Sequence, residues 1–267
     1  MIRAAPLYLC LIAFLATPMQ AQELDVPYFT TEPEVVEGML DMAGVGQGDY
    51  LIDLGSGDGR IVIAAAHRGA VGHGVDLDPE RVTEAEKNAR EAGVSDRIFF
   101  LEENLFDTDF SQATVVTMFL LSAVNLQLRP ELLVRLRPGS RVISHTFDMG
   151  DWEPDAYQVI GIRPVYLWII PAQLEGRWEW KADGEHYAMS VRQQYQKIEA
   201  TLHTGRRSIT MDEAVLRGDR ISLLFHDEKT GKRYVCSGII ENKSITGTVQ
   251  VRGNGSRHIE IWNAQRH

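Results

Sequence analysis

The chain has 267 residues, of which 44% are apolar and 24% are charged, and its formal net charge at pH 7 is −10. This composition is that of an ordinary globular protein and excludes a collagen-like, a disordered or a multi-span membrane protein. The length allows one large domain or two smaller ones, and the acidic balance argues against nucleic acid as a partner, because its phosphates would be repelled.

The first 21 residues have the organisation of a secretory signal peptide. Arg3 precedes an apolar run from Ala4 to Ala16, and the small residue Ala21 stands before Gln22. We therefore expect cleavage after Ala21 and an exported, periplasmic protein. An uncleaved anchor is the alternative, but the run is shorter than the roughly 20 apolar residues that span a bilayer, so we expect no stable membrane span after cleavage. The mature chain would keep one cysteine, Cys236, and could not form an internal disulfide.

The mature sequence divides near Pro171 by charge and by pattern. Residues 22–172 carry 11 basic and 25 acidic side chains, whereas residues 173–267 carry 15 basic and 12 acidic ones. A solvated acidic face would explain the first imbalance without a partner, but the change of sign favours two modules. We expect one domain over 22–172 and a smaller one over 173–267.

Short apolar runs alternate with helical periods in the first module. We expect helices that begin at Pro33, Arg60 and Pro79, and strands over residues 50–54, 71–75, 98–101, 114–119 and 141–145. This alternation predicts an α/β fold, a doubly wound and mostly parallel sheet, with ligands at the carboxyl ends of the strands.

The most informative segment, Asp-Leu-Gly-Ser-Gly-Asp-Gly at 53–59, lies between the first strand and its helix. Its glycines permit a tight turn and a close approach of a ligand to the backbone, and the helix start offers free N–H groups to an anion. Asp76 ends the second strand, where a carboxylate can accept hydrogen bonds from ribose hydroxyls. A dinucleotide site requires Gly-x-Gly-x-x-Gly, and Arg60 occupies the last of these positions, so the segment fits dinucleotide binding poorly.

The segment resembles motif I of the class I S-adenosylmethionine-dependent methyltransferases, Asp/Glu-x-Gly-x-Gly-x-Gly, and the resemblance covers about Tyr28 to Ala172. Within that family it is similar to bacterial proteins of the Dot1-type and related seven-strand lysine methyltransferases, whose Asp-Leu-Gly-Ser-Gly-Asp-Gly-Arg run is matched from Asp53 to Arg60. The resemblance implies that S-adenosyl-L-methionine is the cofactor.

The resemblance also implies roles for individual residues in cofactor binding. The methionine part would lie against Gly55, Ser56 and Gly57, with Asp53 keeping the site in shape and Asp76 at the ribose. The adenine would lie near Glu103, Asn104 and Leu105, and a lid before the first helix would contain Tyr28 and Thr30.

The segment after the fourth predicted strand departs from part of the family. DNA- and glutamine-methylating relatives carry Asn/Asp-Pro-Pro-Tyr/Phe there, whereas residues 117–121 read Thr-Met-Phe-Leu-Leu. With no polar group to grip a planar amide or a base amine, we expect an alkyl amine acceptor, such as a protein lysine, and place Phe119 at the reaction site. Phe119 and Leu120 could equally be core residues.

The loop after the fifth strand supplies the other acceptor-side candidates. His145 could relay a proton, Asp148 or Asp151 could orient an amine, and Trp152 could face a cation. The alternatives are a satisfied structural histidine and an aspartate that caps a turn. Acidic groups should lie at the entrance and apolar groups near the methyl group, because a carboxylate next to the amine would keep it protonated.

From Gly176 onward the apolar period is two, which predicts a small antiparallel β domain with a bulge near Gln194. Ile259 and Ile261 belong to its last predicted strand, and Arg217 to Asp219 form a turn. The tryptophans of this module either line a binding face or close a small core; they are Trp178, Trp180 and Trp262.

Two classes of function remain open. The first is an exported S-adenosylmethionine-dependent N-methyltransferase that acts on a protein lysine or another amine, a small molecule included. The second is a non-catalytic exported nucleoside-binding protein on the same fold, which export favours because the cofactor is made in the cytoplasm. No metal site is expected, because the eight histidines and the one mature cysteine show no ligand spacing.

Overall fold

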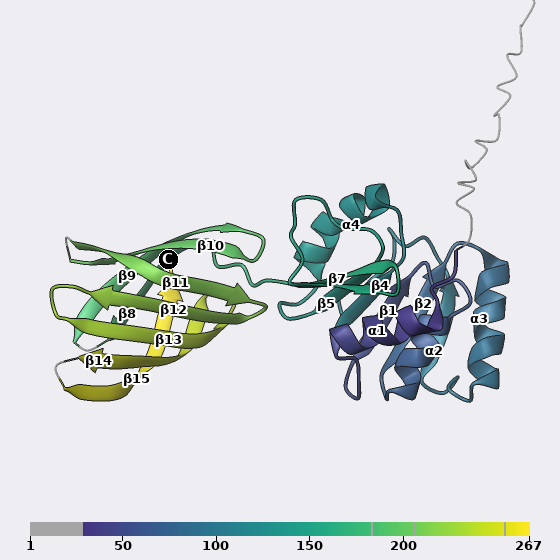
Figure 1. The fold of residues 1–267 in the computed structure, drawn as a ribbon, viewed down its shortest axis with the longest axis horizontal. Helices are drawn as coiled ribbons and strands as arrows, with labels where there is room; N and C mark the ends of the chain where they lie inside the picture. Colours follow the sequence, from purple (N-terminus) through teal and green to yellow (C-terminus); the bar gives the residue numbers. More distant parts are fainter. Residues whose placement is uncertain (1–28, 183, 206, 254) are drawn as a thin grey trace, which may run out of the picture.

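The computed structural model describes residues 29–267 except 183, 206 and 254, so the predicted signal peptide and Tyr28 lie outside the described residues. Figure 1 shows a layered α/β part joined by a short segment to a separate β part. Seven strands form one sheet in the order β3-β2-β1-β4-β5-β7-β6, and eight form a closed barrel. The predicted fold class is confirmed.

The sheet is parallel from β3 to β5, and β7 and β6 complete it in antiparallel pairing. The sequence did not predict β6 and β7, because apolar residues also occupy the exposed positions of β6, Tyr157 and Val159, and hide its alternation. The seven strands are β1 (Tyr50–Leu54), β2 (Val71–Asp76), β3 (Ile98–Glu102), β4 (Val115–Met118), β5 (Arg141–His145), β6 (Ala156–Ile160) and β7 (Arg163–Ile169).

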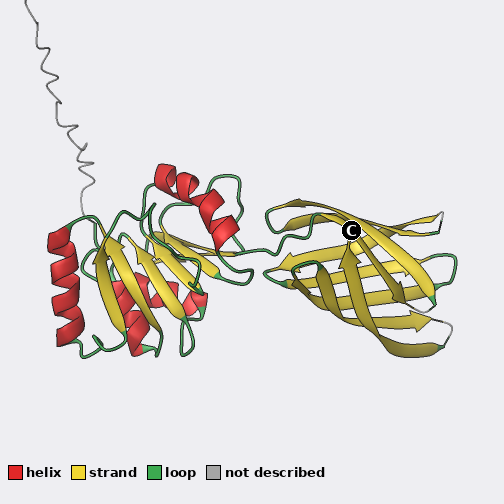
Figure 2. Cartoon of the chain, turned by 180° about the vertical axis from the view of Figure 1, so that it is seen from behind, coloured by secondary structure: helices red, strands yellow, loops and turns green. Residues whose placement is uncertain are grey.

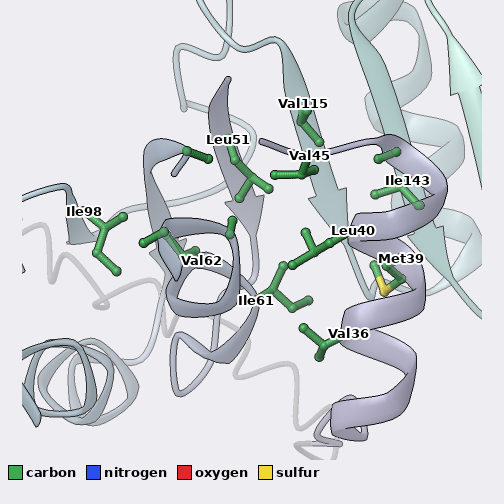
Figure 3. Packing of buried hydrophobic residues seen from close by; sticks show 14 of the residues in the cluster. Val36, Met39, Leu40, Val45, Leu51, Ile61, Val62, Ile98, Val115 and Ile143 are labelled. Carbon is green, nitrogen blue, oxygen red and sulfur yellow. The ribbon is translucent and has the colours of Figure 1, made fainter. Parts of the chain in front are cut away.

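Helices lie on both faces of this sheet, as Figure 2 shows. On one face, Met39 and Leu40 of α1 and Ile61 of α2 pack toward strand residues such as Leu51 (Figure 3). The opposite face is covered by α4, which the sequence did not predict because Pro130 lies inside it and proline normally ends a helix. The helices are α1 (Pro33–Ala43), α2 (Arg60–His67), α3 (Pro79–Glu91) and α4 (Ser122–Arg135).

Each barrel strand pairs antiparallel with its neighbours, and the interior is filled by side chains. Trp178, Trp180 and Trp262 are 0%, 3% and 0% exposed, so they close a core and do not line a surface. The strands are β8 (Gly176–Ala182), β9 (Glu185–Gln194), β10 (Lys197–Thr204), β11 (Arg207–Arg217), β12 (Arg220–Asp227), β13 (Lys232–Glu241), β14 (Ser244–Gly253) and β15 (Ser256–Arg266).

Two details of the barrel differ from the sequence prediction. The change of phase after Gln194 is a hairpin turn, in which Tyr195 has a φ of 53°, and the bulge lies instead between Met211 and Glu213. Ile259 and Ile261 are on the outer face, because Trp262 and Ala264 take the inward positions of β15. The predicted turn at 217–219 is confirmed.

In the described part of the chain, no helix combines the length and apolarity needed to cross a bilayer.

Candidate functional site

The glycine-rich loop of residues 55–59 joins the carboxyl end of β1 to the first residue of α2. Gly55, Gly57 and Gly59 have φ values of 82°, 53° and 79°, a region in which other residues are strained. The backbone N–H groups of Gly55 and Ser56 both donate to the Val75 carbonyl, at 2.9 Å, so the loop folds over the end of β2. The side chain of Ser56 is buried against Gly74, which leaves the backbone of this loop as the surface available to a ligand.

The side chain of Asp76, the last residue of β2, is hydrogen-bonded to this loop. One of its carboxylate oxygens accepts from the Gly57 N–H at 2.8 Å, and the other accepts from the Asp78 N–H at 3.0 Å. Each oxygen of a carboxylate has a further lone pair, so the group can still accept from ribose hydroxyls. The two features that the sequence singled out therefore lie at one place.

Asp53 lies within the sheet and is 2% exposed, so its side chain supports the site from inside. The Thr117 hydroxyl donates to it at 2.6 Å from the neighbouring strand β4. Burial raises the pKa of the Asp53 carboxyl to about 7, against the opposing effect of that hydrogen bond.

The residues predicted beside the adenine follow β3 on the same edge of the sheet. The side-chain oxygen of Asn104 accepts from the Phe106 N–H at 3.0 Å, so this amide closes a turn. Leu105 is half-buried against the core that α4 covers, and Glu103 accepts from Thr108 at 3.2 Å. Their place at the strand ends agrees with the predicted role, and their contact with a cofactor stays a prediction.

The end of β5 meets the segment before α1. Nδ1 of His145 lies 3.0 Å from the Thr31 hydroxyl, and the Thr31 carbonyl accepts from Arg60 of α2 at 2.8 Å. Thr30, in the predicted lid, is exposed next to this contact. The segment before α1 is thus tied to both the start of α2 and the end of β5.

Phe119 forms an apolar cluster with its neighbours at the strand ends. Its ring centroid is 4.0 Å from that of His145 and 6.2 Å from that of Phe147. Phe119 and Leu120 are half-buried, and a Cβ added at Gly55 would lie 3.1 Å from Leu120. Leu120 packs against the core and borders the glycine-rich loop, and the place of Phe119 at the reaction site stays a prediction.

His145 is fully buried, and burial lowers its pKa to about 4. The imidazole is therefore neutral at neutral pH and is a weak proton acceptor. Its Nε2 atom has no hydrogen-bond partner among the described residues. Its assignment as a catalytic residue stays a prediction, and a hydrogen-bonding role fits this pKa better than storage of a proton.

The loop of residues 146–153, called here the post-β5 loop, contains the remaining predicted residues. Asp148 is exposed and accepts from the Gly150 N–H at 3.1 Å, and Asp151 accepts from Arg129 at 2.6 Å. The suggestion that Trp152 could face a cation is wrong, because its side chain is 0% exposed and stacks on Tyr195 at a centroid distance of 5.6 Å. The two carboxylates lie at the rim, outside the apolar cluster.

Asn125 of α4 holds the post-β5 loop, and sequence reasoning missed it. Its side-chain N–H₂ group lies 3.1 Å from the Phe147 carbonyl and 3.2 Å from that of Asp148, and the residue is fully buried. A lone amide on the apolar face of a helix is the signal that could have indicated it, but α4 itself was not predicted.

The β9–β10 turn of the barrel holds the same loop from the other side. Gln196 accepts from the Trp152 indole N–H at 2.8 Å and donates to the Glu153 carbonyl at 2.7 Å. The Tyr195 hydroxyl donates to Asp151 at 3.1 Å, and Lys197 pairs with Glu153 at 2.6 Å. The barrel therefore fixes the post-β5 loop, which contains the predicted acceptor-side residues.

The residues at this edge suit S-adenosyl-L-methionine. The glycines hold the loop in a conformation that other residues rarely adopt, and the Asp76 carboxylate provides acceptors for a ribose. Three buried polar atoms at the strand ends have no hydrogen-bond partner in the described part of the chain: Ser56 Oγ, His145 Nε2 and Thr146 Oγ1. Buried polar atoms are normally paired, so these three atoms have unused hydrogen-bonding capacity at this edge of the sheet.

Comparison with known proteins identifies similar methyltransferases. Residues 53–156 match the family model described as the ANTKMT methyltransferase domain. The chain is 44% identical over 155 residues to a protein-lysine N-methyltransferase of Saccharolobus islandicus, which covers 54% of this chain and 94% of that protein. It is 34% identical over 146 residues to the adenine nucleotide translocase lysine N-methyltransferase of Mus musculus, covering 54% of this chain and 62% of that protein.

A solved structure extends this similarity to the fold. An RNA methyltransferase from Salinibacter ruber, crystallised with S-adenosyl-L-homocysteine, is 50% identical to this chain with a TM-score of 0.54. The alignment covers 55% of this chain and 96% of that one. The demethylated cofactor in that crystal supports the same cofactor for the site described here.

Proposed function

The chain belongs to the class I S-adenosylmethionine-dependent methyltransferases, in the family of its protein-lysine N-methyltransferase relatives, and from this premise we propose that it methylates lysine side chains of a protein. S-adenosyl-L-methionine would supply a methyl group on a sulfonium, ready for direct displacement by a nucleophile. In such a reaction the protein's main contribution is to align the two reactants.

The observation that carries the proposal is the apolar border of the site. Phe119, Leu120 and Phe147 are half-buried, and Leu120 lies beside Gly55 of the glycine-rich loop. No side-chain amide or carboxylate interrupts residues 118–121. An alkyl chain with an amine at its end suits this border, whereas the side chains of residues 118–121 offer a planar amide or base no hydrogen bond.

The amine must lose a proton before it can attack. A lysine amine has an ordinary pKa of about 10.4, so its neutral form costs roughly 4 to 5 kcal/mol at pH 7. The half-buried aromatic rings lower this cost, because desolvation disfavours the charged amine. Asp148 and Asp151 lie exposed at the rim, where they can attract a cationic lysine without facing the reacting nitrogen. His145, with its low pKa, would not keep the released proton, which would pass to solvent.

RNA is the second candidate acceptor, because the similar Salinibacter ruber protein is described as an RNA methyltransferase. The excess of acidic over basic residues in 22–172 argues against it, since phosphates would be repelled by this surface. A transfer assay separates the two acceptors.

The full chain would be incubated with methyl-labelled S-adenosyl-L-methionine and, in parallel, with total protein, total RNA and the small-molecule fraction of its source cells. We expect label in protein, recovered as methyllysine after hydrolysis, and loss of the signal in an Asp76→Ala variant. Asp107→Ala is the matched control, because Asp107 is exposed on the same edge of the sheet. Label in RNA or in small molecules alone would refute the lysine proposal.

We also propose that the enzyme acts outside the cytoplasm, because residues 1–21 have the organisation of a secretory signal peptide. A reporter that is active only after export, fused after residue 40, should be active. Loss of reporter activity when Leu11 and Phe14 are replaced by Asp would tie export to the apolar run, and an inactive parent fusion would return the protein to the cytoplasm.

A further inference from the structure

One part of the outer face of the barrel has no acidic side chain. Outward-facing residues of β12 to β15 are in register and form a block of sixteen positions. None of the sixteen is Asp or Glu, although the chain has 37 acidic residues. Figure 1 shows these four strands side by side. The sixteen positions are every second residue, counted from the first, of Arg220–His226, Arg233–Ile239, Thr246–Arg252 and Arg257–Asn263.

Three arginines face one another across this block and form what we call the arginine row. Arg233 is the direct partner of Arg252, which is in turn the direct partner of Arg257. Like charges in such pairs are only about 5 Å apart at their Cβ atoms and destabilise a sheet. Arg252 donates to Gln250 at 2.9 Å, and no acidic partner of the three occurs among the residues that the structure describes. The next residue of the row, His226, is the partner of Arg233 and pairs with Asp212 at 2.6 Å.

Aliphatic side chains lie directly beside the arginine row. Leu224, Val235 and Ile259 occupy the adjacent row, about 7 Å further along the strands. Ile259 and the next outward residue, Ile261, are 61% and 81% exposed. Neighbouring exposed aliphatic residues form an apolar patch of the kind that marks interaction sites, so unpaired cations and exposed hydrocarbon occur together on one surface.

We propose that this face binds the surface of a membrane that contains anionic lipids. Guanidinium groups bind phosphate with paired hydrogen bonds, and aliphatic side chains beside them can enter the boundary between headgroups and acyl chains. Single-stranded nucleic acid fits less well, because none of the sixteen positions carries Phe, Tyr or Trp, and the one imidazole, of His226, pairs with the Asp212 carboxylate, which would repel a phosphate. A second copy of the chain also fits less well, since it would bring a second arginine row to the same interface.

The position of the row leaves the methyltransferase site open. β12 begins at Arg220, beside a turn whose Gly218 lies close to Gly139 of the α/β part, and ends beyond His226. The arginine row therefore lies at the end of the barrel that points away from the sheet (Figure 1). A membrane bound there would not cover the glycine-rich loop.

The test is co-sedimentation of the full chain with vesicles of phosphatidylcholine, with or without phosphatidylglycerol. We expect binding only with the anionic lipid, and a loss of roughly 100-fold in affinity when Arg233, Arg252 and Arg257 are replaced by Gln. Replacing Ile259 and Ile261 by Ser should weaken binding while keeping its dependence on anionic lipid. The matched control replaces Arg97, Arg137 and Arg192, which are exposed elsewhere, by Gln.

Several outcomes would overturn the proposal. These are no binding of the parent chain to anionic vesicles, an equal loss in the control variant, or no effect of the isoleucine changes. Binding to single-stranded RNA that depends on the arginine row while vesicles stay unbound would assign the face to nucleic acid. A doubled mass in light scattering that the arginine changes abolish would assign it to a second copy. Circular dichroism and cofactor binding, which do not involve this face, verify that each variant is folded.

Discussion

Replacing Gln196 by Ala tests whether the barrel holds the post-β5 loop in place. The substitution removes the acceptor of the Trp152 indole N–H, and that side chain is fully buried. An unsatisfied buried donor costs about 1 to 3 kcal/mol, whereas the second lost bond, to the Glu153 carbonyl at an exposed residue, can be replaced by water. We expect the free energy of unfolding of the α/β part to fall by about 1 to 3 kcal/mol in chemical denaturation followed by tryptophan fluorescence.

The same variant should separate acceptor binding from cofactor binding. The glycine-rich loop is fixed by Val75 and Asp76, neither of which contacts the barrel turn, so the affinity for S-adenosyl-L-methionine should stay unchanged. The post-β5 loop should become looser, and the KM for the acceptor should rise. Gln194→Ala, two residues earlier and exposed, is the matched control and should change stability by less than about 0.5 kcal/mol. Equal stability of the two variants, or a parallel loss of cofactor affinity, would refute the reasoning.

Three further predictions concern the strand ends. Because of burial, the pKa of His145 is about 4 in the folded state, against 6.5 in the unfolded state. The test is made in an Asp53→Asn background, because the Asp53 carboxyl, with a pKa of about 7, would titrate with the opposite effect on stability. Between pH 6.5 and pH 4, the free energy of unfolding of Asp53→Asn should therefore fall by up to about 3 kcal/mol more than that of the double variant Asp53→Asn/His145→Phe. Equal falls in the two variants would contradict the burial argument. Phe119→Ala should lower kcat for lysine methylation at least tenfold while calorimetric cofactor affinity changes only a few-fold, and an unaffected kcat would remove Phe119 from the site. Gly59→Ala should destabilise the chain by about 1 to 3 kcal/mol, because its φ is 79° and the new Cβ would lie 2.6 Å from Phe100; a melting temperature equal to that of the parent would contradict this.

The cofactor side of the site could be predicted because its parts are local in the sequence. The glycines of 55–59 and Asp76 end neighbouring parallel strands, so any parallel sheet brings them to one edge. The support of the acceptor side could not be predicted in the same way. Asn125 belongs to a helix with an internal proline, and Gln196 comes from a different module.

The burial of Trp152 shows the same limit. The sequence places it in a polar loop, but contacts with Trp168 and Tyr195, which are distant in the sequence, enclose its ring. The outward position of Ile259 and Ile261 has a related cause: β15 has apolar residues at both parities, and the larger Trp262 takes the interior. Periodicity predicts that a strand exists, whereas competition for the core decides which face it buries.

Calorimetric titration of the full chain with S-adenosyl-L-methionine tests most directly whether the glycine-rich loop and Asp76 form the methyl-donor site. We expect saturable binding of one molecule per chain, similar binding of S-adenosyl-L-homocysteine, and none of a dinucleotide. Asp76→Ala should weaken this binding about 100-fold or more, because two hydrogen bonds to a charged group are lost, while Asp107→Ala should not. Failure of the folded chain to bind, or equal affinity in Asp76→Ala, would contradict the account.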